Sequence, residues 1–460
     1  MAGRPDWLML EKADTLGGTW RDNVYPGCAC DVESHLYSFS FFPNTEWTRT
    51  FARQGEIRSY LEDVADHYRL RDRIRFGAQV TGAEWDGAAW DVTLGDGSTL
   101  RARYLVLGTG ALHEPAVPEI EGIERFAGSA FHSAQWDHTV DLRGKRVAVI
   151  GTGASAVQFV PAVAGETGHL TLFQRTAPWV LPKPDKPIRE RTRRAFRRVP
   201  GLRRAYRTAL YWRHEAMVVG FLHPRIMRLA ERAVRLYLRR TFAGDATLRR
   251  KVTPDFTLGC KRVLMSNDYY PALRRDDVTV ETAGIERITE HGVVTADGVE
   301  HPADVIVFGT GFRVGDGLGR MSISGRDGTK LADLWRDGQQ AFHGTTIAGF
   351  PNLFTVVGPN TGLGHSSMVL MIESQLNYVL DAMRLVDADG AVAIDTRSDV
   401  QHAHNADLQE RLGAAVWGSG GCASWYLDEH GRNRTLWPGY TFSFRRRTRR
   451  VDPAAHELLA

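Results

Sequence analysis

The stretch from Phe126 to Gly153, FAGSAFHSAQWDHTVDLRGKRVAVIGTG, decides the fold. Its second half predicts a short apolar strand, Arg146 to Ile150, that runs into a glycine turn and then a helix from Ala156 to Val163. Strand, glycine turn and helix in this order are typical of a dinucleotide-binding unit. The glycines let the backbone approach a pyrophosphate, and the helix N-terminus offers free N–H donors. The predicted nucleotide-binding residues are Gly151, Thr152, Gly153, Ala154 and Ser155.

The next predicted strand, Leu170 to Phe173, ends in Gln174-Arg175-Thr176. An acidic residue at this point would bind the ribose hydroxyls of NAD, whereas an arginine accommodates the 2′-phosphate of NADP. No Asp or Glu is present here. We therefore expect NADPH as the reductant, with Arg175 and Thr176 among its binding residues. The alternative is an ordinary solvated arginine on the surface.

Length and composition indicate an ordinary globular protein. A chain of 460 residues with 43% hydrophobic and 24% charged residues can form two to three domains. Its formal net charge of +4 does not require nucleic acid as a partner. We expect no secretory signal, and the sequence contains no apolar run long enough to span a bilayer.

The cysteine usage predicts neither a disulfide framework nor a metal site. The four cysteines are few and scattered, and their spacing is not that of a zinc site. We expect a reducing, cytoplasmic location. The cysteines are Cys28, Cys30, Cys260 and Cys422.

The first half of the opening stretch carries a second motif, F-x-G-x-x-x-H-x-x-x-W-D, formed by Phe126, Gly128, His132, Trp136 and Asp137. It resembles the fingerprint of type I Baeyer–Villiger monooxygenases, which use FAD, NADPH and O2 to convert ketones into esters or lactones. Gly17 to Asp31 is similar to a further family pattern, G-G-x-W-x-x-x-x-Y-P-G-x-x-x-D. The resemblance extends from Glu11 to about Trp437.

The resemblance implies an α/β fold with two dinucleotide-binding, Rossmann-like domains of the flavin monooxygenase type. The expected division is 1–125 for the first part of the FAD-binding domain and 126–137 for a linker that contains the fingerprint. It continues with 138–310 for the NADP-binding domain and 311–460 for the rest of the FAD-binding domain. The fingerprint residues are thereby implied to act at a domain junction and not in the chemistry.

The start of the chain departs from the family pattern. A predicted strand, Trp7 to Leu10, ends at Glu11, where an acidic residue binds the adenosine ribose. That residue normally comes about 20 positions after a glycine fingerprint. Only Gly3 precedes it here, so we expect the first strand, phosphate loop and first helix of the FAD-binding domain to be missing.

Other FAD contacts are implied by the resemblance alone. They comprise a turn and aromatic residues against the flavin, a backbone contact to the adenine, and a helix from Met368 to Leu380 whose N-terminus points at the flavin pyrimidine. The residues implied are Gly18, Thr19, Trp20, Tyr37, Val80 and Met368.

The implied catalytic residue is Arg262, with Asp31 to orient it. By composition, Lys261-Arg262 is only a dibasic pair, which usually lies on a solvated face. The resemblance implies that Lys261 assists the 2′-phosphate and that Trp425 binds the nicotinamide nucleotide. A guanidinium suits the reaction because it stays protonated and can stabilise negative charge on the reacting oxygens.

Two other readings remain open at this point. One is a flavin monooxygenase that oxidises sulfur or nitrogen, and the other is a truncated NADPH-binding fragment without catalysis. The arginine-rich insertion at about 187–251 has helical spacing and is expected to cap the substrate cleft. A basic amphipathic helix within it would also allow peripheral attachment to anionic membranes.

Overall fold

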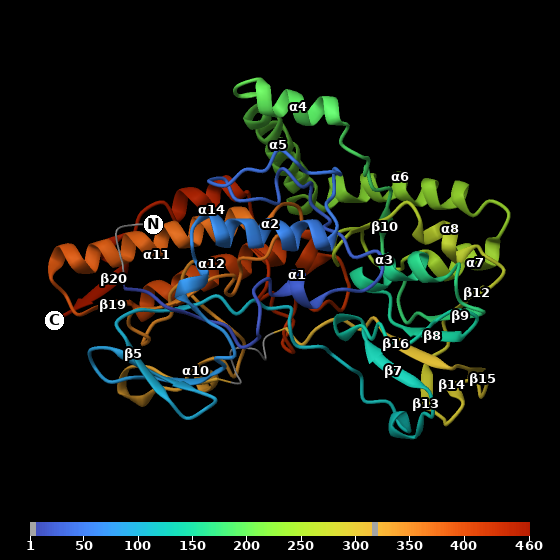
Figure 1. Ribbon diagram of the computed structural model, residues 1–460, viewed down its shortest axis with the longest axis horizontal. Helices are drawn as coiled ribbons and strands as arrows, with labels where there is room; N and C mark the ends of the chain where they lie inside the picture. The colour runs from blue at the N-terminus through green and yellow to red at the C-terminus, as the bar shows by residue number, and fades with distance from the viewer. Residues whose placement is uncertain (1–5, 315–320) are drawn as a thin grey trace.

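The computed structural model describes residues 6–314 and 321–460 (Figure 1). One side of the molecule, on the right in Figure 1, holds a parallel sheet in the order β12-β9-β8-β16-β7. Its three central strands are almost continuously apolar and buried, as expected for a parallel sheet covered on both faces. The strands are β7 (Ser129–His132), β8 (Arg146–Ile150), β9 (His169–Phe173), β12 (Val278–Glu281) and β16 (Val305–Phe308).

The predicted glycine turn joins β8 to helix α3 (Ala154–Val163). Gly151 has a φ of 103°, and a Cβ built there would lie 2.6 Å from the carbonyl oxygen of Gly309. Only glycine is compatible with both conditions. Because β8 pairs with β9 on one side and β16 on the other, the turn lies at the carboxyl edge of the sheet, where the strand order reverses.

The other side of the molecule contains a four-stranded sheet in the order β17-β3-β4-β5 and two parallel strand pairs, β1·β2 and β18·β6. Within the described ranges, no strand joins these two pairs into one sheet. The strands are β1 (Met9–Leu10), β2 (Ile74–Arg75), β3 (Val80–Trp85), β4 (Trp90–Leu94), β5 (Thr99–Ala102), β6 (Leu105–Leu107), β17 (Ser322–Ser324) and β18 (Leu353–Thr355).

The apolar pattern of the sequence predicts one continuous strand at 74–80 and another at 100–107, and both are interrupted in the structure. The apolar segment 74–80 divides into β2 and β3, because Gly77 and Ala78 donate backbone hydrogen bonds to Ala13 and Glu11 beside β1. The segment 100–107 divides into β5, which pairs with β4, and β6, which pairs with β18. Apolar alternation does not show this change of partner.

Long helices cover these sheets. Helix α2 (Gln54–His67) ends one residue earlier than the helix that the amphipathic pattern predicts, Gln54 to Tyr68, whereas α11 (Met368–Asp389) is longer than expected. The arginine-rich insertion forms α4 (Glu190–Arg198), α5 (Leu202–Leu222), α6 (Pro224–Thr241) and α7 (Ala246–Val252), with α4 and α5 projecting at the top of Figure 1. Among the described residues, no helix combines the length and apolarity needed to cross a bilayer.

The remaining elements are short or lie toward the C-terminus. The helices are α1 (Thr19–Asp22), α8 (Tyr269–Leu273), α10 (Leu331–Leu334), α12 (Ser398–Ala414), α13 (Val416–Ser419) and α14 (Thr441–Arg447). The strands are β10 (Val180–Leu181), β11 (Leu264–Met265), β13 (Ile285–Ile288), β14 (Gly292–Thr295), β15 (Glu300–Pro302), β19 (Ala393–Thr396) and β20 (His456–Leu459).

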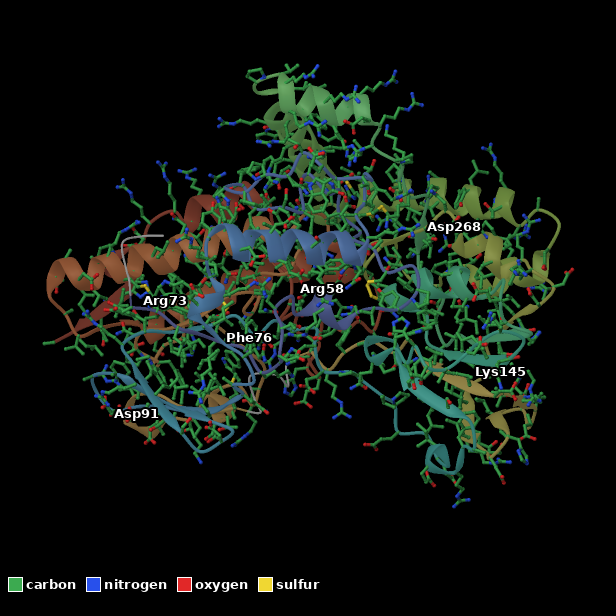
Figure 2. All side chains as sticks on the ribbon, viewed as in Figure 1. Arg58, Arg73, Phe76, Asp91, Lys145 and Asp268 are labelled. Atoms are coloured by element: carbon green, nitrogen blue, oxygen red, sulfur yellow. A yellow bond between two sulfur atoms is a disulfide. The ribbon has the colours of Figure 1, made fainter. Side chains whose placement is uncertain are left out.

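The largest apolar core crosses the junction between the two sides. It joins Tyr25 and Cys28 near the N-terminus to α3, to Phe221 and Met227 of the insertion, and to Leu436 near the C-terminus. Side chains fill this junction densely in Figure 2. Four distant segments therefore meet in one packed region, and the candidate site lies at its edge.

Candidate active site

Asp31 and Arg262, the two residues implied to carry the chemistry, meet in the structure. Nη2 of Arg262 donates to Oδ2 of Asp31 at 3.2 Å, across 231 positions of sequence. Asp31 follows α1 in a loop, and Arg262 lies two residues before β11. The side chain of Asp31 is 15% exposed and that of Arg262 is 43% exposed. The carboxylate is thus enclosed by protein, while the guanidinium remains accessible to a small molecule.

Gln158 of α3 holds the loop that carries Asp31. Its Nε2 donates to Oδ1 of Asp31 at 3.2 Å and to the carbonyl oxygen of Ala29 at 3.0 Å, and its Oε1 accepts from the hydroxyl of Tyr25 at 3.0 Å. Gly27 permits the close approach, since a Cβ there would lie 2.7 Å from the carbonyl oxygen of Gln158. The helix that follows the glycine turn therefore also positions the carboxylate. No sequence motif marks Gln158 for this role.

A second cation, Lys183, also faces Asp31. Its Nζ lies 3.7 Å from Oδ1 of Asp31, donates to the carbonyl oxygen of Cys30 at 2.9 Å and lies over the ring of Phe51. Strand pairing explains why two cations arrive together. Lys183 follows β10 by two residues, Arg262 precedes β11 by two, and the two strands pair in parallel. No motif in the sequence marks Lys183.

The electrostatic environment keeps Arg262 protonated. Partial burial acts to lower its pKa, but the charge of Asp31, with smaller contributions from Tyr426 and Cys30, outweighs this and raises the pKa. Tyr426 is itself buried, and burial raises the pKa of its hydroxyl to about 12 although the charge of Arg262 acts in the opposite direction. Tyr426 is a further neighbour of Arg262 that the sequence analysis missed.

The residues predicted to bind NADPH gather at the carboxyl edge of the parallel sheet. The Oγ1 of Thr152 donates to the carbonyl oxygen of Thr176 at 3.0 Å and connects the turns after β8 and β9. Gly153, the N-cap of α3, makes no side-chain hydrogen bond, so the first N–H groups of the helix remain available for an anion. Ala154 and Ser155 form the first turn of α3.

Two cations stand beside that edge. Arg175, which follows β9, is exposed, and Lys261 is half-buried over the ring of Phe256. Burial, and then the positive charge of Arg175, lower the pKa of Lys261. Two neighbouring cations favour the binding of an anionic group, and the 2′-phosphate of NADPH is such a group.

The sequence predicted no disulfide framework, and this prediction was wrong for one pair of cysteines. Cys260 and Cys422 form a disulfide across 162 positions of sequence, while Cys28 and Cys30 are free and buried. The bond joins the residue before Lys261 to the segment that carries Trp425. The side chain of Trp425 is 44% exposed, and its ring lies 4.5 Å from that of Tyr426. Spacing along the chain gave no sign that these segments meet.

The residues implied to contact FAD belong to several elements of the chain. Nε1 of Trp20 donates to the hydroxyl of Tyr37 at 3.0 Å. Glu11 accepts from the backbone N–H of Ala13 and from Arg21. The other four begin elements or cap them. Gly18 is the N-cap of α1 and Thr19 its first residue, Val80 begins β3, and Met368 begins α11.

A pocket opens at the carboxyl ends of the parallel strands β6 and β18. It is lined by Leu107, Thr109, Gly110 and the segment 355–359. In open α/β sheets, ligands bind at this edge of parallel strands. This edge is therefore where a second dinucleotide is expected on this side of the molecule.

The fingerprint residues lie in β7 and in the segments on either side of it. His132 ends β7, its Nδ1 accepts from the backbone of Ala134 at 3.1 Å, and its ring packs against Phe312 of the return segment. Trp136 packs on Phe159 of α3, and Asp137 accepts from Thr139. Phe126 packs against the apolar cluster beneath β16, and a Cβ at Gly128 would lie 2.3 Å from the carbonyl oxygen of Asp304.

Comparison with known sequences gives consistent matches. Residues 34–206 match a family model described as pyridine nucleotide-disulphide oxidoreductase. A Baeyer-Villiger monooxygenase of Pseudomonas aeruginosa is 50% identical, over 99% of this chain and 87% of that protein. A Baeyer-Villiger monooxygenase of Streptomyces coelicolor is 49% identical, over 99% of this chain and 88% of that protein.

Solved structures resemble the chain over nearly its whole length. An oxidized steroid monooxygenase bound to NADP matches with a TM-score of 0.87 and 31% sequence identity. The complex of OTEMO with FAD and NADP matches with a TM-score of 0.89 and 28% sequence identity. A cyclohexanone monooxygenase from Rhodococcus sp. Phi1 bound to NADP+ matches with a TM-score of 0.87 and 28% sequence identity. Each match covers 98% of this chain and 94% of the other.

Proposed function

The chain belongs to the Baeyer–Villiger monooxygenases, which are FAD- and NADPH-dependent, and on that premise we propose that Arg262 stabilises the negative charge that develops during oxygen transfer. Bound FAD and NADPH supply the electrons that reduce O2, of which one atom enters the product and the other leaves as water. The observation that carries the proposal is that the guanidinium of Arg262 is accessible to solvent while it is hydrogen-bonded to the enclosed carboxylate of Asp31.

Arg262 has the properties that this role requires. Its charge is permanent, and the attraction of Asp31 raises its pKa further. Several N–H donors in one plane can face both the attacking oxygen and the carbonyl oxygen to which it adds. Asp31, fixed by Gln158 and Lys183, keeps the guanidinium from rotating away. Donors already in place when charge appears need no reorganisation, and such donors often contribute most to the rate.

We further propose how the chain holds the two dinucleotides. Arg175 and Lys261 bind the 2′-phosphate of NADPH, and the turn from Gly151 to Ser155 holds its pyrophosphate. Trp425 covers the nicotinamide nucleotide and excludes water from the site of oxygen transfer. Glu11, Gly18, Thr19, Trp20, Tyr37, Val80 and Met368 are assigned to FAD.

We propose that the substrate is a ketone, because a fixed cation beside the site favours addition of an oxygen anion to a carbonyl carbon. Oxidation of a soft sulfur or amine nitrogen does not create a carbonyl oxyanion and gains less from Arg262. We expect such oxidation only as a side activity.

The test replaces Arg262 in the FAD-loaded enzyme. We expect Arg262→Ala to accept hydride from NADPH at a nearly unchanged rate but to lose ester formation by about 10²–10³-fold. The measurements are stopped-flow flavin reduction and ester yield over a panel of ketones. Arg384→Ala, on the exposed side of α11, is the matched control. Undiminished ester yield in Arg262→Ala would remove this residue from its role.

A further inference from the structure

Positive charge is concentrated in one part of this molecule. The insertion from Pro187 to Lys251 contains 18 arginines and one lysine but only four acidic residues. The insertion has a net charge of +15. Because the whole chain has a net charge of +4, the residues outside the insertion carry a net charge of −11. Figure 1 shows α4, α5 and α6 of this insertion along the upper edge, and nitrogen-tipped side chains project from α4 in Figure 2. The insertion therefore forms a basic face on a molecule that is otherwise acidic.

Helix α6 has two apolar stripes, of which only one is packed. Met227 and Leu238 lie on the inner stripe, which belongs to the main core. The outer stripe consists of Ile226, Leu229 and Leu236, which are 48%, 66% and 46% exposed. Their spacing places them on one side of the helix, with the small Ala233 between. Large apolar side chains in a row on a surface mark an interaction site.

Arginines border this outer stripe. With 3.6 residues per turn, four of them follow one side of the stripe and a fifth lies at its C-terminal end. All five are exposed, and within the described residues none makes an ion pair. The single acid of the helix, Glu231, is engaged by Arg235 and by the backbone of Leu258. The five are Arg225, Arg228, Arg232, Arg239 and Arg240.

We propose that this outer face of α6 docks the enzyme on the surface of an anionic phospholipid bilayer. An interfacial helix inserts a short apolar face at the boundary between headgroups and acyl chains, while flanking arginines bind phosphates and extend toward water. The apolar stripe and the unpaired arginines of α6 match both requirements. A helix lying flat on the membrane is also compatible with the absence of a spanning helix among the described residues.

Two other occupants fit less well. A second copy of the chain, related by a two-fold axis, would place the same arginines against one another, and like charges would repel. A nucleic acid would satisfy the arginines but would leave Ile226, Leu229 and Leu236 without an apolar partner. The bilayer alone satisfies both kinds of side chain.

The experiment is vesicle flotation with the FAD-loaded, full-length enzyme. The probes are vesicles of phosphatidylcholine alone and of equal parts phosphatidylcholine and phosphatidylglycerol. We expect binding only to the anionic vesicles, with a decrease at high salt. The variant Arg225→Gln/Arg228→Gln/Arg232→Gln should bind roughly 100-fold more weakly. Ile226→Ser/Leu229→Ser/Leu236→Ser should also lose binding, even at low salt.

Matched controls separate this face from charge and apolarity in general. Arg125→Gln/Arg143→Gln/Arg384→Gln and Val299→Ser/Leu334→Ser/Leu376→Ser change exposed residues elsewhere and should bind like the unchanged protein. All variants should keep their flavin and their oxidation of NADPH with a water-soluble ketone.

Several outcomes would overturn the proposal. They are no binding of the unchanged protein to anionic vesicles, equal binding to neutral ones, or an equal loss in the control variants. Tight binding to an oligonucleotide without binding to vesicles would instead assign the face to nucleic acid, and a concentration-dependent dimer that the α6 variants abolish would assign it to a second copy. None of these results depends on the role proposed for Arg262.

Discussion

Asp31 is contacted by side chains from three separate parts of the chain. Arg262 and Lys183 supply positive charge, and Gln158 supplies an amide donor. Removing one partner of a part-buried charge pair leaves the other uncompensated. The orientation of Arg262 therefore depends on residues that touch Asp31 as well as on Asp31 itself.

We propose that the choice of NADPH over NADH depends on the guanidinium of Arg175. Arg175→Ala should raise the KM for NADPH by about tenfold or more, since a charge-assisted contact contributes roughly 1.5–3 kcal/mol. The KM for NADH, which has no 2′-phosphate, should hardly change. Steady-state kinetics with both nucleotides provides the measurement. Equal effects on the two would contradict the assignment of Arg175, and Arg287→Ala, exposed on β13, serves as the control.

Among the elements, α12 and β20 each contribute a buried histidine that is neutral in the folded protein. Burial lowers the pKa of His404 and of His456 to about 4. His456 is hydrogen-bonded to the hydroxyl of Tyr378 on α11 at 2.7 Å. In the unfolded chain both titrate near the usual histidine pKa of about 6.5, so the unfolded state binds more protons below that pH. The contribution of these two histidines to the free energy of unfolding is therefore fully present above about pH 6.5 and is lost as the pH falls toward 4.

We expect the free energy of unfolding to fall by about 2 kcal/mol per histidine on going from neutral pH to about pH 5. Urea unfolding at a series of pH values tests this. His404→Gln should remove the contribution of that histidine, about 2 kcal/mol, whereas His402→Gln, exposed on the same helix, should leave the dependence intact. A pH dependence that persists unchanged in His404→Gln would show that other groups cause it.

At the scale of the whole molecule, the Cys260–Cys422 disulfide links the segment before Arg262 to the segment that carries Trp425. Closing a loop of 162 positions restricts the unfolded chain, and such a bond stabilises a protein by about 2–5 kcal/mol. Cys422→Ser should therefore lower the melting temperature. It should also weaken retention of NADP, because the segment with Trp425 is released.

Differential scanning calorimetry and NADP titration, each with and without dithiothreitol, measure these two effects. Dithiothreitol should shift the unchanged protein toward the behaviour of Cys422→Ser and should leave that variant unaffected. If dithiothreitol changes the melting temperature and NADP binding of both proteins equally, its effect does not come from reduction of the Cys260–Cys422 disulfide.

The sequence by itself determined the features that depend on neighbouring residues. The glycine turn after Ile150 and the absence of an acid beside Arg175 predicted a dinucleotide site, since strand, turn and helix form within one short segment. The family motifs predicted Asp31 and Arg262 as partners, and the structure brings them into contact. Only the tertiary structure decided that Gln158 and Lys183 hold Asp31 and that Cys260 meets Cys422. These contacts join segments more than 120 positions apart, and packing of the whole core, which no local pattern encodes, brings them together.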